Sequence, residues 1–187
     1  MNAIDLINKI YTLPSESGRR LEEFITEATF PKGRILLREN KIERDIYFIK
    51  QGIVRAYTCK DGDEVTFWFG KEGEVILSMR SYIQNQKSYE TIELLEDCLL
   101  YKLPTDQLQQ LFREDIHIAN WGRKLAEQEL IQTEKRLISR QFSTAAERYE
   151  ELIQHDPQLL QRVQLGHIAS YLGITQVSLS RIRAGIK

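Results

Sequence analysis

The sequence predicts an α+β protein: an antiparallel β-roll or jelly-roll barrel with flanking helices, then a long helix, then a small C-terminal helical domain. Three observations support this. Residues 30–104 are rich in branched and aromatic residues between Gly and Pro turns, residues 105–142 place apolar residues at helical spacing, and residues 165–184 read as two short helices joined at a glycine. Because 42% of the 187 residues are hydrophobic, the chain can bury a substantial core.

The first thirty residues predict two helices that cover the barrel. Each has an apolar face, and Pro14 and Gly18 are expected to break the chain between them. The first face comprises Ile4, Leu6, Ile7, Ile10 and Tyr11, and the second comprises Leu21, Phe24, Ile25 and Ala28.

Short strands are expected next, because branched and aromatic runs alternate with turn residues. Asp61-Gly62 is the clearest hairpin signal, since a tight hairpin turn needs a positive φ at both central residues. The expected strands are residues 34–38, 46–50, 53–59, 64–69, 74–78, 91–95 and 98–103.

A long helix is predicted from about residue 105 to 142, with one interruption near Asp115. One barrel can cover only part of so long an apolar face, so we expect a second copy of this helix to cover the rest in a parallel two-fold dimer. The central stripe is Ile116, Ala119, Ala126, Leu130, Thr133 and Leu137, flanked by Ile118, Trp121, Leu125, Ile131 and Ile138.

A capping box, Thr144-Ala-Ala-Glu147, restarts a helix, and His155-Asp156-Pro157 ends it. We therefore divide the chain into a sensor barrel with its dimerisation helix, residues 1–142, and a DNA-binding domain, residues 143–187.

The C-terminal segment has the pattern of a helix-turn-helix. Ala169 is small where two helices must touch, Gly173 can take the left-handed conformation that ends the first helix, and Thr175 can cap the second. The apolar positions expected to pack inside are Ile168, Leu172, Ile174, Leu179 and Ile182.

The side chains left outside that core are polar, apart from one valine, and suit base edges and phosphates of double-stranded DNA. Residues 157–187 hold four of the 26 basic residues and no acidic one, which leaves 22 basic against 27 acidic residues in 1–156. The predicted DNA-binding residues are Thr175, Gln176, Val177, Ser178, Ser180, Arg181, Arg183 and Lys187.

Composition argues against an enzyme. A metal-dependent cupin would need histidines on its strands, and residues 1–116 contain none. Neither a nucleophile elbow nor a Gly-rich phosphate loop is present. Because no signal peptide or membrane-length apolar run is visible, we expect a soluble cytoplasmic protein without a membrane partner.

The order of barrel, long helix and helix-turn-helix resembles the Crp/Fnr family of bacterial transcription regulators over nearly the whole chain. Phe30-Pro-Lys-Gly33, the run Asp45–Gly52 and Gly73-Glu74 look like the glycine-bounded turns of a cyclic nucleotide-binding domain. The resemblance implies a ligand-binding barrel, a homodimer whose paired recognition helices read a two-fold symmetric operator, and RNA polymerase as a further partner.

The effector region departs from that family. Members that bind cyclic AMP use a Gly-Glu-Leu segment for the ribose and, about ten residues later, an Arg-Ser or Arg-Thr pair for the phosphate. Matching Gly73-Glu74 to the preceding turn places the effector pocket at Leu77, Ser78, Ser88 and Tyr89. No arginine stands there, which argues against cyclic AMP and leaves another small-molecule effector, or none, with no certain cofactor.

The predicted recognition helix also differs from the pattern of that family. Many members present an acidic residue and arginines, whereas Gln176, Val177 and Arg181 stand here, so we expect a different operator. The chain ends at Lys187, so we also expect no C-terminal wing and more salt-sensitive binding. The alternative is a ligand-sensing module whose C-terminal hairpin binds a protein; the acid-free tail favours DNA.

Overall fold

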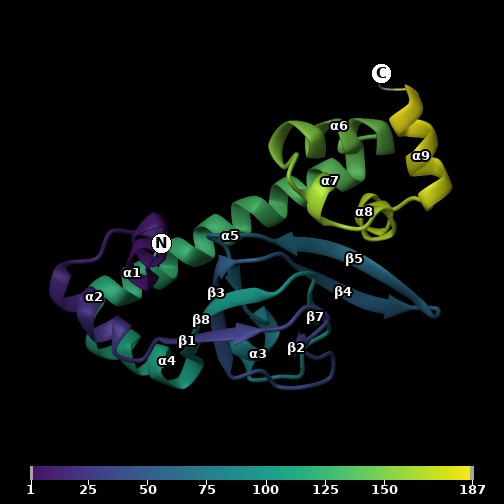
Figure 1. Ribbon diagram of the computed structural model, residues 1–187. Helices are drawn as coiled ribbons and strands as arrows, with labels where there is room; N and C mark the ends of the chain where they lie inside the picture. The colour runs from purple at the N-terminus through teal and green to yellow at the C-terminus, as the bar shows by residue number, and fades with distance from the viewer. Residues whose placement is uncertain (1, 186–187) are drawn as a thin grey trace. The chain divides into compact units, whose positions relative to one another are not determined.

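The chain folds as a mixed α and β protein, and the computed structural model describes residues 2–185 (Figure 1). It divides into two compact units. The barrel unit is Met1–Ala56 with Phe69–Glu129, and the helical unit is Tyr57–Trp68 with Leu130–Lys187. The longest helix, α5 (Ile116–Phe142), begins in the first unit and continues unbroken into the second.

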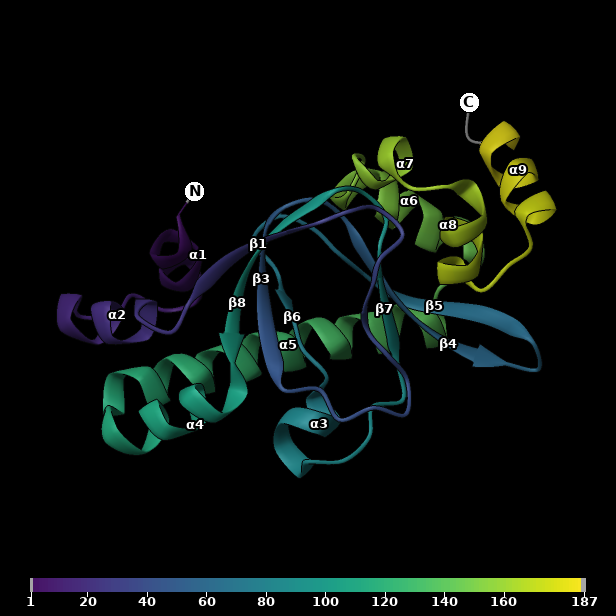
Figure 2. The same ribbon diagram turned by 60° about the horizontal axis from the view of Figure 1, so that its bottom comes forward.

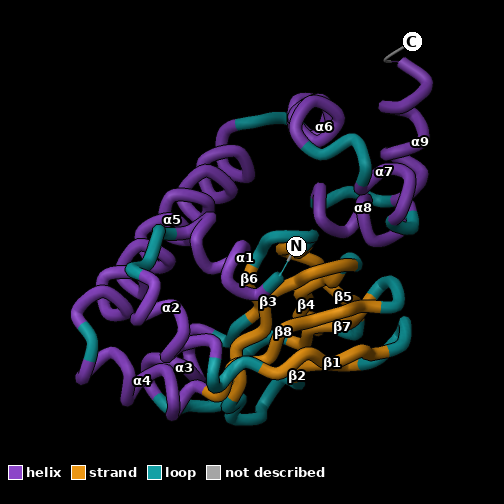
Figure 3. The backbone as a smooth tube through the Cα atoms, turned by 60° about the vertical axis from the view of Figure 1, so that its left-hand side comes forward, coloured by secondary structure: helices purple, strands orange, loops and turns teal. Residues whose placement is uncertain are grey.

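The strands form two four-stranded sheets, in the orders β1-β8-β3-β6 and β2-β7-β4-β5 (Figure 3). All seven expected strands are present, and the turn between β4 and β5 has positive φ at Asp61 and Gly62, as predicted. The strands are β1 (Thr26–Phe30), β2 (Ile35–Leu37), β3 (Asp45–Gln51), β4 (Val54–Lys60), β5 (Asp63–Gly70), β6 (Val75–Ile76), β7 (Thr91–Leu94) and β8 (Cys98–Pro104).

The helices agree with the predicted periodicity in most places. The break at Asp115 separates α4 from α5, and the Thr144–Glu147 capping box starts α6 with both reciprocal hydrogen bonds formed. Besides α5, the helices are α1 (Ala3–Ile10), α2 (Ser15–Glu22), α3 (Met79–Gln84), α4 (Thr105–Glu114), α6 (Ala145–His155), α7 (Leu159–Arg162), α8 (Leu165–Leu172) and α9 (Gln176–Gly185).

The prediction for the second helix is wrong at both ends. The observed helix, α2, begins at Ser15, before Gly18, and ends at Glu22. Ala28 lies in β1, where it pairs with Leu100 of β8. A ladder of backbone hydrogen bonds to a distant strand outweighs the local helical spacing. Gly18 does not break the chain but lies inside α2, where an added Cβ would be 3.0 Å from Ile4, so glycine lets α1 and α2 approach closely.

Trp121 anchors the first half of α5 in the core of the barrel unit. Its indole N–H donates to the Ile7 carbonyl of α1 at 3.0 Å, and its ring lies 6.0 Å from that of Phe48 on β3. Ile118 and Leu125, on the same side of α5, are also buried. The flank of the predicted apolar face is therefore covered by the barrel unit itself.

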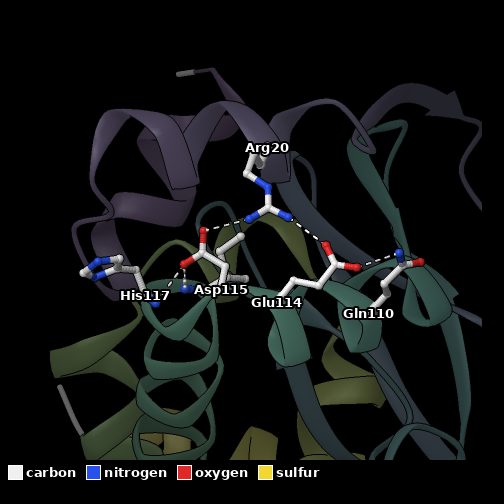
Figure 4. Close-up of polar contacts among 6 residues, drawn as sticks. Arg20, Gln110, Glu114, Asp115 and His117 are labelled. Carbon is white, nitrogen blue, oxygen red and sulfur yellow. Dashed lines mark hydrogen bonds and ion pairs between the residues drawn. The ribbon is translucent and has the colours of Figure 1, made fainter.

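The start of α5 is held by an ionic network (Figure 4). Asp115 caps α5 by accepting hydrogen bonds from the backbone N–H groups of His117, at 2.9 Å, and Ile118, at 3.3 Å. Arg20 of α2 lies between two carboxylates, 3.5 Å from Asp115 and 2.7 Å from Glu114 (Figure 4). One guanidinium thus ties the N-terminal helices to the junction of α4 and α5.

The pKa of Asp115 reports this network. Burial acts to raise the pKa of the carboxyl, but hydrogen bonds from Ser17 and from the backbone of Ile118 and His117 oppose it. With the nearby charge of Arg20, these contacts hold the pKa of Asp115 below its ordinary value. The cap is therefore ionised at neutral pH, as a helix N-terminus favours.

Candidate nucleic-acid interface and effector region

Helices α8 and α9 form a helix-turn-helix on the core that the sequence predicts (Figure 2). Ile168, Ala169 and Leu172 of α8 are buried together with Leu179 of α9, and Ile174 and Ile182 are half-buried. Other buried side chains of the helical unit include four from α6, α7 and the residue after it, namely Tyr149, Leu152, Leu159 and Val163, and two from the β4–β5 hairpin, Tyr57 and Thr66.

The turn between the two helices follows the local signals in the sequence. Gly173 has a φ of 72°, and the N–H of Ile174 returns to the carbonyl of Ala169 at 3.0 Å, which closes α8 with a Schellman motif. Thr175 Oγ1 accepts the N–H of Ser178 at 3.2 Å, so the predicted hydroxyl cap of α9 is present.

Six of the predicted DNA-contacting side chains, from Gln176 to Arg183, lie along α9, and Thr175 directly precedes it. Gln176, Arg181 and Arg183 are exposed, and Val177 is 62% exposed although it is apolar. The hydroxyls have intrahelical partners: Ser180 donates to the Gln176 carbonyl at 3.0 Å, and Ser178 lies 3.0 Å from the Thr175 hydroxyl. Lys187 lies outside the described residues. Contact with DNA by this set stays a prediction.

The end of α8 makes polar contacts that the sequence analysis did not predict. Arg140 Nη1 of α5 donates to the Tyr171 carbonyl at 3.0 Å, and Arg148 Nη2 of α6 donates to the Leu172 carbonyl at 2.7 Å. These partners are separated by more than twenty residues, so no local pattern could have indicated them.

The β4–β5 hairpin also contacts α8. Ser170 Oγ accepts the N–H of Thr66 at 2.9 Å and donates to the Glu64 carbonyl at 2.8 Å. The hairpin residues 57–68 consequently belong to the helical unit, although strand periodicity alone assigned them to the barrel.

The predicted effector residues flank α3, a helix that was not predicted. Ser78 is buried and caps α3, with its Oγ 3.5 Å from the Ser81 N–H, while the buried Ser88 hydroxyl donates to the Arg38 carbonyl at 2.7 Å. Leu77 is half-buried and Tyr89 is exposed. Both serine hydroxyls therefore stabilise local structure, and their part in an effector pocket stays a prediction.

Two buried charged side chains of the barrel, Arg55 and Glu90, have hydrogen-bond partners. Arg55 of β4 is 4% exposed, and its Nε and Nη2 donate to Glu93 Oε2 of β7 at 2.8 and 2.7 Å. Glu90 is buried, and its Oε2 accepts the N–H of Tyr89 at 3.2 Å. A carboxylate thus stands next to the position where the family resemblance would place a phosphate.

A partly open cavity of about 350 Å³ lies in the helical unit, between the end of α5, α6 and α8. Its lining includes Arg136, Arg140 and Arg148, together with Phe67 and Leu152. Within residues 2–185, no cluster of three or more His, Cys, Asp or Glu side chains could hold a metal ion, and no helix is long and apolar enough to cross a membrane.

The second half of α5 leaves its apolar stripe uncovered in the chain. Leu130 is 70% exposed and Phe142 is 75% exposed, and Ile131, Leu137 and Ile138 are each more than half exposed. Contiguous exposed apolar side chains on one helix are typical of a surface that binds another protein chain.

Residues 27–115 match the family model of the cyclic nucleotide-binding domain. Among curated proteins, none matches the chain significantly. The match spans β1 to the start of α5 and includes the region predicted to hold an effector.

Three solved structures are similar to nearly the whole chain. FixK2 from Bradyrhizobium japonicum is 22% identical with a TM-score of 0.75, covering 87% of this chain and 84% of its own. The regulator CLP from Xanthomonas campestris, described as c-di-GMP responsive, is 17% identical with a TM-score of 0.68 and coverages of 92% and 91%. The catabolite activator protein of Thermus thermophilus is 19% identical with a TM-score of 0.60 and coverages of 95% and 85%.

Gly173→Ala should destabilise the helical unit by about 1–2 kcal/mol, because an L side chain is strained at positive φ. The new Cβ would also lie 3.2 Å from Arg140 Nη2. Gly166→Ala is the matched control: its φ is not positive, and the nearest atom to the new Cβ is 3.9 Å away. Urea unfolding followed by circular dichroism measures both, and equal midpoints for Gly173→Ala and wild type would contradict the assigned turn.

Proposed function

We propose that this chain, in which residues 27–115 form a cyclic nucleotide-binding domain and whose fold is that of the Crp/Fnr transcription regulators, binds DNA as a dimer and regulates transcription. The observation that carries the proposal is the exposed, acid-free face of α9 on a well-formed helix-turn-helix. The proposal includes RNA polymerase as a partner and the cytoplasm as the place of action.

The chemistry of α9 supports sequence-specific contact. A glutamine amide can pair with adenine in the major groove and a guanidinium with guanine, which suits Gln176 and Arg181. Val177 is exposed and could contact a thymine methyl group. Arg183, further along α9, is placed to neutralise phosphate charge.

The exposed stripe on α5 supports a dimer. A monomer would leave five large apolar side chains from the second half of α5 in water, at Leu130, Ile131, Leu137, Ile138 and Phe142. A second copy offers an identical stripe, and a two-fold axis along α5 pairs like with like. Such a dimer carries two copies of α9, as a two-fold symmetric operator requires.

The side chains of the barrel favour an effector other than cyclic AMP. A buried phosphate needs a bidentate guanidinium, but Arg55 is engaged by Glu93 and the Nε of Arg80 donates to Gln86 at 3.1 Å. The buried carboxylate of Glu90 would repel a phosphate next to it. A neutral or cationic small molecule suits these side chains better.

Selection from a pool of genomic DNA fragments tests DNA reading. Wild type should recover a shared two-fold symmetric motif, and Gln176→Ala with Arg181→Ala should lose it, since each good base contact contributes about 1–3 kcal/mol of discrimination. The matched control is Gln161→Ala with Arg113→Ala, which removes the same side chains at exposed positions outside α9. Random sequence recovered by wild type would refute the proposal.

Sedimentation equilibrium tests the dimer. Wild type should sediment as a dimer at micromolar concentration, and Leu137→Glu should sediment as a monomer, because an unpaired carboxylate is costly to bury in an apolar interface. Gln132→Glu adds the same charge on the exposed cavity side of α5 and should leave the dimer intact. A dimer that survives Leu137→Glu would exclude the stripe as its interface.

Thermal unfolding tests the effector. Cyclic AMP at about 1 mM should leave the melting temperature unchanged, since a ligand stabilises a fold only if it binds the native state. AMP at the same concentration is the control for non-specific effects. A rise with cyclic AMP alone would show that the barrel binds it despite the missing arginine.

A further inference from the structure

We propose that Arg140 and Arg148 are positioning residues that set the preferred spacing of the two DNA half-sites. The inference rests on the proposed function and adds to it, because neither arginine lies on the DNA-reading face of α9. The two side chains join the end of α5 to the end of α8, and α8 carries the recognition helix.

The carbonyl groups at the end of α8 need hydrogen-bond partners from outside the helix. A helix leaves its last four carbonyls without intrahelical partners. The Schellman turn serves two of them, because Ile174 N–H bonds to Ala169 and Gly173 N–H bonds to Ser170, both at 3.0 Å. The last two, Tyr171 and Leu172, accept from the arginine pair.

Both arginines are also connected to the C-terminal end of α5. Arg140 stands in the last turn of α5 itself. Arg148 belongs to α6, but its Nη1 donates to the carbonyl of Ser143, the residue that follows the end of α5. The arginine pair therefore contacts the C-terminal ends of both helices.

Electrostatics explains why arginine suits this place. Each helix C-terminus carries a partial negative charge, so two such ends held near each other repel. A guanidinium stays charged at any physiological pH and presents several donors in fixed directions. Two guanidiniums placed there satisfy the carbonyls and offset the repulsion.

Arg140 and Arg148 also line the cavity between α5, α6 and α8, which has a volume of about 350 Å³. Each donates a hydrogen bond to a carbonyl at the end of α8, Arg140 to Tyr171 and Arg148 to Leu172. These bonds are a direct polar restraint between the end of α5 and the end of α8.

The consequence reaches α9 through a short connection. Only residues 173–175 separate α8 from α9, and Gly173 and Thr175 are both fixed by backbone geometry and capping. Holding α8 against α5 therefore sets the direction of α9 relative to α5. In the proposed dimer α5 lies along the two-fold axis, so this direction fixes the distance between the two recognition helices.

The test is a selection from a DNA library that carries two half-sites with a variable number of base pairs between them. Wild type should prefer one spacing over its neighbours by about tenfold, the scale of one hydrogen bond to a charged group. Arg140→Ala should keep the same bases within each half-site but reduce the spacing preference to about threefold or less. The base preference within each half-site is the internal control, because general unfolding would abolish both the base preference and the spacing preference.

Arg136→Ala is the matched control. Arg136 lies one turn before Arg140 on α5 and lines the same cavity, but its Nη2 donates to the hydroxyl of Thr133 in its own helix at 3.1 Å. It should keep the wild-type spacing preference. Arg148→Ala should reduce the spacing preference as Arg140→Ala does, and circular dichroism should confirm that it is folded. If Arg148→Ala is unfolded, the result for Arg140→Ala alone tests the proposal, because Arg140 is exposed.

The results distinguish the positioning role of the two arginines from the proposed DNA binding. An unchanged spacing preference in Arg140→Ala, or an equal loss in Arg136→Ala, would overturn the positioning role and leave DNA reading intact. Wild type that recovers no paired motif would overturn the proposed function, and the positioning role with it.

Discussion

The burial of Trp121 is the contact on which the rest of the structure depends. Its indole bonds to α1, its ring packs near Phe48 of the barrel, and the adjacent Gly122 leaves room for Phe112 of α4, which a Cβ would collide with. These contacts fix the first half of α5 in the barrel unit. In the second half of α5, which ends at Phe142, the apolar stripe is exposed.

Polar groups at helix ends organise both units. Asp115 caps the start of α5 and is held by Arg20, while Arg140 and Arg148 contact the carbonyls at the end of α8. Each charge has the sign that its helix end favours, a carboxylate at an N-terminus and guanidiniums at C-termini. The same rule therefore serves stability in the barrel unit and, in our proposal, the placement of the recognition helix.

Residues 27–115 match the model of the cyclic nucleotide-binding domain, and charged side chains of this barrel pair with each other. Gly52 has a positive φ of 111° and lies so close to Cys98 that no side chain fits, as a tight turn against a neighbouring strand requires. Ser78 and Ser88, which flank α3, bond to backbone groups, and Arg55 of β4 pairs with Glu93 of β7. A buried ion pair of this kind resists separation, since either partner alone would be an uncompensated charge. An effector would have to bind to polar groups other than those engaged in these hydrogen bonds and this ion pair.

The sequence by itself determined those parts whose partners lie within a few residues. The Asp61-Gly62 hairpin, the Thr144–Glu147 capping box and the Gly173–Thr175 turn follow from conformational and capping preferences that act over one turn of chain. The tertiary structure alone decided that residues 26–30 form a strand, that the hairpin bonds to Ser170, and that Arg140 and Arg148 meet α8. Those outcomes depend on groups distant in sequence, and no local spacing encodes which distant donor or strand will be brought near.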